Sequence, residues 1–503
     1  MGKSKVMDGP VYDAKTLGAG RVVVLGFQHM FAMFGATVLV PALTGLSVSA
    51  TLLFAGLGTL LFHLISKRKV PAFLGSSFAF LAAYGAISSM EIEGMTKEDL
   101  LPYACFGVAI AGLVYLVLAG LIKAFGVNRV MKFFPPIVTG PIIIAIGLCL
   151  SGTAIQSCST NWAIAVVAIL IVVICNIWGK GMIKITPILL GVVGACALCI
   201  FFALMNSRVV TIGAGDAAAN YYCIAGNPNL QLFSTASVRA IQEAKWIGLP
   251  VAYKNTVFNI FTGGNVNNGL LVTAVISIVP ISLATIVEHI GDISAISSTV
   301  GKNYIKDPGL HRTLTGDGLA TTLASLFGAP ANTTYGENTG VLTLSKVYDP
   351  MVVRLAALFA ICFSFSPKLA ACISAIPTPV VGGISLVLYG MISAVGVRNV
   401  VENQVDFSKS RNVIIAAIIL VLSIGIKYYN STGSIDFMIG SVAISLSGLA
   451  VGSLAGIILN AILPGKDYVF EDKQEAAQSK NSTLKSEPVK KKRIKKRSNS
   501  YIF

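Results

Sequence analysis

Long apolar segments alternate with short polar ones along almost the whole chain. Apolar runs recur from Val22 to Leu463, and each is close to the roughly 20 residues that an α-helix needs to cross a bilayer. The pattern predicts an all-α polytopic membrane protein with fourteen transmembrane segments. Their expected centres are Phe31, Leu57, Phe78, Leu113, Ile143, Ile169, Val193, Ile278, Leu319, Asn338, Leu358, Leu386, Ile418 and Leu449.

The third and tenth of these segments, around Phe78 and Asn338, are short and rich in Gly, Ser and Thr. Such residues are poor formers of a continuous helix. Non-helical backbone is tolerated at membrane depth where protein buries it. We therefore expect short extended or half-helical segments at these two places.

Lys and Arg are concentrated in alternate loops, for example at Lys67, Lys180 and Arg312. Because cytoplasmic loops are enriched in these residues, the distribution predicts that both termini are cytoplasmic. The acidic stretch EIEGMTKED and a long loop over 207–268 then lie outside the cell. Within these external loops, Cys158 and Cys223 are a candidate disulfide pair, and unpaired thiols are the alternative.

Composition agrees with a membrane protein, because 54% of residues are hydrophobic and 12% are charged. The chain has a net charge of +16, and the segment after Pro464, which contains KKKRIKKR at 490–497, holds 11 of its 38 Lys and Arg residues. We interpret residues 464–503 as a disordered basic cytoplasmic tail attracted to anionic lipid rather than as a nucleic-acid site.

Two parts of the chain repeat each other. PPIVTGPIIIAIG and TPVVGGISLVLYG match at a constant offset of 243, which aligns Pro136, Gly140 and Gly147 with Pro379, Gly383 and Gly390. PAFLGSSF and PANTTYGE also match, which places Phe78 opposite Glu337. Seven segments per repeat require the two halves to be inverted in the membrane, with a site at the midplane between them.

Glu288 and Glu337 are carboxylates inside long apolar stretches. A charge in hydrocarbon is costly, so such residues indicate a functional site. On a helix Glu288 and Asp292 are one turn apart on one face, and two like charges there favour holding a proton. The alternative for Asp292 is a position at the helix end, in water or beside a lysine.

The run Asn332–Asn338 gathers polar groups around Gly336, which lets a ligand approach the backbone. A carboxylate at Glu337 accepts from ring N–H groups, while a free backbone N–H donates to a carbonyl. Pyrimidine-diones and oxopurines present that alternation of donors and acceptors. Phe78 is a candidate for stacking on a flat ring, with ordinary core packing as the alternative.

Other polar residues have two open interpretations. Asp317 belongs either to the same polar network or to a helix cap. His29, which follows Gln28, either makes a structural hydrogen bond, the interpretation that we favour, or contacts the substrate. The four histidines do not cluster with carboxylates or cysteines at metal-ligand spacing. We expect no metal, no cofactor other than a proton as coupling ion, and no enzymatic activity.

The chain resembles the nucleobase–ascorbate (nucleobase:cation symporter-2) transporter family over residues 18–460. The motifs are QHMFAMFGATVLVP, PAFLGSSFAF, IVEHIG, KDPGLHRTLTGDG and NTTYGENTGVLTLSK. The family signature is present as Glu337-Asn338-Thr339-Gly340, followed by Ser345-Lys346, with Ser where Thr is usual.

The resemblance implies a homodimer in the plasma membrane that imports a nucleobase with protons by an elevator motion. It implies a core domain of residues 18–126 and 269–370 and a gate domain of residues 127–206 and 371–463. It also implies substrate contacts at Phe78, Glu288, Tyr335, Gly336, Glu337 and Tyr389. Proton coupling would involve Glu288, Asp292 and Glu337, supported by Gln28, His29, His289, Asp317 and Asn338.

Asp292 departs from the uracil branch of that family, which has His at this position, and is similar to the xanthine and urate branch. Glu337 is typical of the uracil branch. The resemblance therefore favours uracil, with xanthine or urate as the alternative. A remoter alternative is an anion transporter of the sulfate and bicarbonate type, although two carboxylates facing the substrate argue against it.

Overall fold

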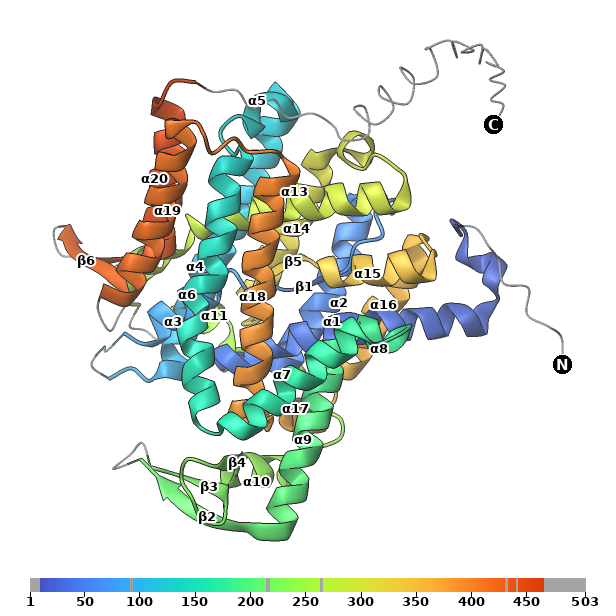
Figure 1. Cartoon of the computed structure of the whole chain (residues 1–503), viewed down its shortest axis with the longest axis vertical. Coiled ribbons are helices and arrows are strands. Elements are labelled where there is room, and N and C mark those ends of the chain that lie inside the picture. The colour runs from blue at the N-terminus through green and yellow to red at the C-terminus, as the bar shows by residue number, and fades with distance from the viewer. Residues whose placement is uncertain are drawn as a thin grey trace, which may run out of the picture.

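The computed structural model describes residues 10–90, 92, 94–213, 218–262, 266–429, 433–439 and 442–465. The basic run at 490–497 and the side chain of Glu337 lie outside the described residues. The described chain is predominantly helical (Figure 1). Its helices are η1 (Ala14–Leu17), α1 (Ala19–Thr44), α2 (Val48–Ile65), α3 (Leu81–Ser88), α4 (Lys97–Phe125), α5 (Val127–Met131), α6 (Pro136–Ser159), α7 (Trp162–Ile177), α8 (Met182–Ile185), α9 (Pro187–Asn206), α10 (Thr235–Glu243), η3 (Tyr253–Asn255), α11 (Phe258–Thr262), α12 (Asn268–Ile278), α13 (Ile281–Val300), η4 (Ile305–Gly309), α14 (Leu310–Leu326), α15 (Gly336–Ser345), α16 (Pro350–Ser364), α17 (Pro367–Ser374), α18 (Thr378–Glu402), α19 (Ser410–Tyr429) and α20 (Gly448–Ile462).

Seven short strands complete the described structure and form three small antiparallel sheets. The strands are β1 (Leu74–Ser76), β2 (Ser207–Ile212), β3 (Ala219–Ile224), β4 (Gln231–Ser234), β5 (Asn332–Thr334), β6 (Ser434–Ile439) and β7 (Val442–Ser447). The sheets pair β1 with β5, β2 with β3 and β4, and β6 with β7. Figure 1 shows β1 and β5 in the middle of the molecule and β2–β4 at one end, beyond α9.

Eight helical stretches in the described residues are long and apolar enough to cross a membrane. They are α1, α2, α4, α6, α9, α12 together with α13, α18 and α19. A ninth candidate is the pair α16 and α17, which is bent by 89°, and α7 and α20 are shorter apolar helices. These helices confirm a multi-pass membrane protein, while the count of fourteen segments stays a prediction.

The third and tenth expected segments each contain a short strand followed by a helix, as the sequence predicted. β1 leads into α3, and β5 leads into α15. The two strands are fully buried and bond to each other. The pairing satisfies backbone groups that would otherwise be costly to bury, so each segment can remain extended in the middle of the protein.

The two members of the longer repeat, α6 and α18, pack directly against each other. A Cβ on Gly147 would lie 2.2 Å from the Tyr389 carbonyl oxygen, and one on Gly140 would lie 2.3 Å from Val400 Cγ2. The glycines therefore allow the helices to approach closely, as small residues do between membrane helices. Both helices also have a repeat proline, Pro136 or Pro379, in their first turn, where a proline costs no backbone hydrogen bond.

Outside the long helices, the structure adds features that the hydrophobic pattern did not predict. The segment expected as a loop over 207–268 contains β2–β4 and α10. The last expected segment, centred on Leu449, instead has the β6–β7 hairpin before α20 begins at Gly448. Cys158 and Cys223 are both buried free thiols, so the candidate disulfide is absent from the structure.

Candidate functional site

The candidate site is built around the β1–β5 pair. The register is Leu74 with Thr334, Gly75 with Thr333 and Ser76 with Asn332. β5 is held from two further helices: Asn332 Nδ2 donates to the Phe54 carbonyl of α2 at 2.8 Å, and Thr321 Oγ1 of α14 donates to the Asn332 carbonyl at 2.5 Å. These contacts fix the point at which the chain turns from β5 into α15.

Glu288 and Asp292 lie one turn apart on α13, and both are half-buried. The Thr334 hydroxyl at the end of β5 donates to Asp292 Oδ2 at 2.9 Å. Asp292 Oδ1 lies beside the start of α15, because a Cβ on Gly336 would be 3.7 Å from it, and this is the nearest described atom outside α15 itself. The arrangement therefore places a carboxylate beside an open helix N-terminus.

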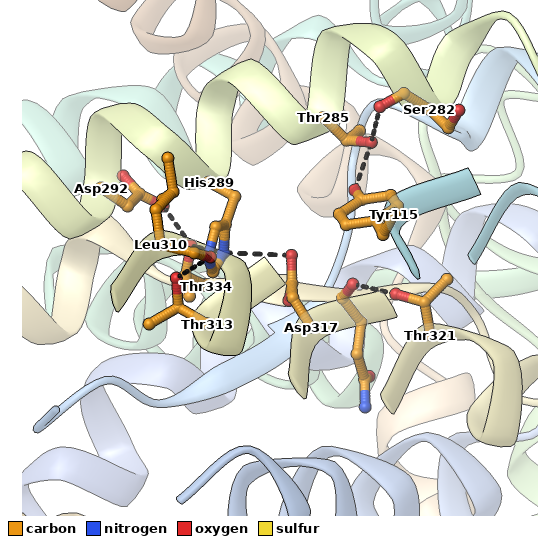
Figure 2. A network of polar contacts seen from close by, with 11 residues as sticks. Tyr115, Ser282, Thr285, His289, Asp292, Leu310, Thr313, Asp317, Thr321 and Thr334 are labelled. Atoms are coloured by element: carbon orange, nitrogen blue, oxygen red, sulfur yellow. Dashed lines mark hydrogen bonds and ion pairs between the residues drawn. The ribbon is translucent and has the colours of Figure 1, made fainter. Parts of the chain in front are cut away.

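Close to Asp292 lie His289 and Asp317, which are both fully buried (Figure 2). His289 Nδ1 is 3.1 Å from Asp317 Oδ2 and 3.4 Å from the Thr334 hydroxyl. Within the described chain neither Asp317 oxygen accepts a hydrogen bond of good geometry, and its contact with His289 is an ion pair when the imidazole is protonated. Asp317 is in the interior of α14 rather than at its start. Asp292, Thr334, His289 and Asp317 thus form one chain of polar contacts, which we call the buried polar network.

Two other expected residues connect α1 to this region. The Tyr335 hydroxyl donates to the Ser76 carbonyl at 2.8 Å and accepts from Thr37 Oγ1 at 3.3 Å. Asn338 Nδ2 donates to the His29 carbonyl at 3.1 Å and is 3.2 Å from His29 Nδ1. α1 is therefore bonded to both the strand pair and α15.

The remaining expected residues have different surroundings. Phe78 is partly buried between β1 and α3 and packs against the main hydrophobic cluster, which includes the buried Tyr389 of α18. Gln28 lines a cavity of about 560 Å³ that α1, α8 and the end of α15 form. Glu337 is the second residue of α15, and its side chain lies outside the described residues.

Sequence reasoning missed the residues that join the site together. Thr334 lies within the polar run that was recognised, but its link between Asp292 and His289 depends on how β5 meets α13. Tyr115 of α4 donates to Thr285 of α13 at 2.5 Å, also within Figure 2. Single hydroxyls in apolar helices give no local signal, because only the tertiary packing selects their partners.

The fold and the site together define a membrane transport protein, since discontinuous segments meet beside buried ionisable groups. The sequence profile of the group described as "Permease family" matches residues 20–432. The chain belongs to this family, the nucleobase:cation symporter-2 family that its motifs resemble. Its similar relatives are named permeases, so the chain is a transporter rather than an enzyme.

The curated relatives are similar over nearly their whole length. The uracil permease of Bacillus caldolyticus is 37% identical over 94% of this chain and 99% of its own. The uracil permease of Bacillus subtilis is 34% identical over 88% of this chain and 92% of its own, and that of Escherichia coli K12 is 33% identical over 88% and 91%.

Solved structures with a similar fold are much more distant in sequence. The transmembrane domain of the cyanobacterial bicarbonate transporter BicA is similar with a TM-score of 0.54 and 14% identity, over 90% of this chain and 99% of that one. SLC26A9 is similar with a TM-score of 0.56 and 12% identity, over 90% and 66%. At these identities the similarity establishes the fold and not the substrate.

Proposed function

We propose that this protein is a proton-coupled symporter that imports uracil. The observation that supports this most directly is the buried polar network, in which a half-buried carboxylate, Asp292, lies beside the exposed residue Gly336. A half-buried carboxylate is suited to taking up a proton, and an exposed helix N-terminus is suited to a ligand carbonyl. The uracil permeases of Bacillus caldolyticus and Bacillus subtilis align with 94% and 88% of this chain.

In the proposed mechanism, a proton from outside is taken up at Glu288 and Asp292. Uracil then bridges Glu288 and Glu337 through its N–H groups, and the Gly336 N–H donates to one of its carbonyls. Phe78 stacks on the ring, while Tyr335 and Tyr389 line the pocket. Proton uptake neutralises the carboxylates and so lowers the cost of moving them through the membrane.

The movement that we propose is an elevator motion in the plasma membrane, with fourteen segments and both termini cytoplasmic. A core domain of residues 18–126 and 269–370 moves past a gate domain of residues 127–206 and 371–463, and two gate domains form a homodimer. The cavity beside Gln28 supports a cytoplasmic exit, because α1 and α15 belong to the proposed core and α8 to the proposed gate. Gln28, His29, His289, Asp317 and Asn338 maintain the geometry of the moving site.

The test is uptake of labelled uracil and labelled xanthine in cells that lack their own permeases, with and without a protonophore. We expect uracil uptake that collapses with the protonophore, and Glu288→Gln should abolish accumulation. Strong accumulation by Glu288→Gln that still depends on the proton gradient would refute the role of Glu288. Uptake of sulfate or bicarbonate without nucleobase uptake would support the anion-transporter alternative.

A second candidate substrate is xanthine or urate, and the presence of Asp292 one turn after Glu288 favours it. Asp292→His introduces the residue expected in the uracil branch. If Asp292 determines the substrate, this variant shifts the ratio of uracil to xanthine uptake toward uracil. An unchanged ratio would show that Asp292 does not set specificity.

A further inference from the structure

Residues 10–17 are built into the fold rather than being a free terminal extension. We call this segment the N-terminal strap. Val11, Ala14 and Leu17 pack with Val347 and Val352 in one small hydrophobic cluster. The strap therefore covers the turn between α15 and α16.

The strap bonds to the end of α13 through Tyr12. The Tyr12 hydroxyl donates to the Val300 carbonyl at 2.8 Å, and Val300 is the last residue of α13. The final carbonyls of an α-helix have no partner within the helix, so this hydrogen bond satisfies one of them. The Tyr12 ring also lies 4.6 Å from Lys302 Nζ, within the range of a cation–π contact.

The same strap bonds to the end of α15. Val11 N–H donates to the Lys346 carbonyl, and Tyr348 N–H donates to the Val11 carbonyl, both at 2.8 Å. Ala14 N–H donates to Asp349 Oδ2 at 2.8 Å, and the other oxygen of this carboxylate caps α16 through Met351 N–H. The ring centroids of Tyr12 and Tyr348 are 5.6 Å apart.

The C-terminal part of α13 and the continuous β5–α15 segment are thus joined at two places. Near the site the connection is the hydrogen bond from Thr334 to Asp292, and at the remote ends it is the strap. At a rise of 1.5 Å per residue, the end of α13 at Val300 lies about 12 Å along the helix from Asp292, and the end of α15 at Ser345 lies about 14 Å from Gly336. Loosening the remote connection lets the two helices change their angle, which displaces Asp292 relative to the Gly336 N–H.

We propose that Tyr12 is a positioning residue, which sets the separation of the α13 carboxylates and the α15 N-terminus through the strap. The inference rests on the proposed function, because those two groups form the proposed substrate site. Tyr12 touches no proposed substrate-binding residue in the contacts above, so its effect on substrate affinity must pass through α13 and α15.

The experiment uses the full chain and compares Tyr12→Phe, Tyr12→Ala and the control Thr16→Val. Phe removes only the hydroxyl, whereas Ala also removes the ring contacts. Thr16 Oγ1 donates to the Asp13 carbonyl within the strap, so Thr16→Val removes a hydroxyl whose hydrogen bond stays inside the strap. KM and Vmax for uracil are measured per molecule in the membrane, together with backbone hydrogen exchange in the purified protein.

For Tyr12→Phe we expect KM to rise about two- to tenfold, the range that corresponds to one net hydrogen bond, with Vmax per molecule little changed. Tyr12→Ala should raise KM further, and Thr16→Val should leave it unchanged. Exchange should increase at the ends of both α13 and α15. An unchanged KM with less protein in the membrane would show a merely structural role and overturn the proposal.

The exchange measurement separates this proposal from the proposed function. If the wild-type protein transports no uracil, the proposed function fails, but exchange still decides whether the strap couples the two helices. Faster exchange confined to residues 10–17 in Tyr12→Phe would overturn the coupling. Faster exchange at both helix ends would support it for whatever substrate the site binds.

Discussion

The buried pair of His289 and Asp317 allows a quantitative test of the site. His289→Leu replaces the imidazole by an apolar group of similar size and leaves the Asp317 carboxyl group without the imidazole that lies 3.1 Å from it. Both side chains are 0% exposed, so water cannot replace the lost partner. Removing one partner of a buried ion pair typically costs about 3–5 kcal/mol. This corresponds to a factor of roughly one hundred to a few thousand in the unfolding equilibrium constant.

The double variant His289→Leu/Asp317→Asn tests whether charge causes that cost. A neutral amide has the shape of the carboxylate but carries no charge to desolvate, so we expect it to restore at least half of the lost stability. The remaining deficit should be about 1–3 kcal/mol for an unsatisfied polar group. The matched control is Thr313→Val on the same helix, whose hydroxyl donates only to the Leu310 carbonyl at 3.0 Å. It should cost about 0.5–1.5 kcal/mol.

The assay is equilibrium unfolding of the purified protein in mixed micelles, titrated with a denaturing detergent. All four proteins are compared under one set of conditions, because only differences in the free energy of unfolding matter. A double variant that is no more stable than His289→Leu would refute the reasoning, since the cost would then come from lost packing. A single variant within 1 kcal/mol of wild type, on the order of one weak contact, would show that the pair adds little to stability.

Three further substitutions test the site and the contact between α6 and α18. Gly75→Ala should reduce uptake per molecule in the membrane by at least about tenfold. An added Cβ would lie 2.5 Å from the Tyr335 ring, and such overpacking would force the ring to move. Thr334→Val should reduce proton-driven uptake about ten- to a hundredfold, the range for a hydrogen bond to a charged group, whereas Thr334→Ser should remain close to wild type. Gly147→Ala should lower thermal stability, because its Cβ would lie 2.2 Å from an α18 carbonyl oxygen, whereas Gly120→Ala, with no heavy atom within 4 Å, should not.

The hydrophobic pattern predicted much of the scaffold because apolar runs of membrane length have few alternative structures in lipid. It also predicted the extended third and tenth segments, because Gly, Ser and Thr weaken the helix there. The register of β1 and β5 was not predictable. Every residue of both strands is buried, so there is no alternation of polar and apolar positions to fix which residues pair.

For the site, the sequence identified the unusual residues but not their connections. The spacing of Glu288 and Asp292 placed both on one helix face, and α13 does contain both. The contact of His289 with Asp317 joins residues on two helices, and the contact of Thr334 with Asp292 joins a strand to a helix. Such pairings depend on helix rotation and depth, which hydrophobicity alone does not determine. The N-terminal strap escaped notice because a polar segment outside the apolar runs resembles an unstructured extension.

The position of Asp292 sets the electrostatics at the N-terminus of α15. A helix N-terminus attracts anions through its free N–H groups and partial positive charge. Here Asp292 places its own carboxylate beside the N-terminus of α15. In its ionised form that carboxylate offsets the partial positive charge and repels an anion, and it also offers an acceptor for ligand N–H groups. A helix end with these electrostatics suits a neutral ligand with N–H donors better than it suits an anion.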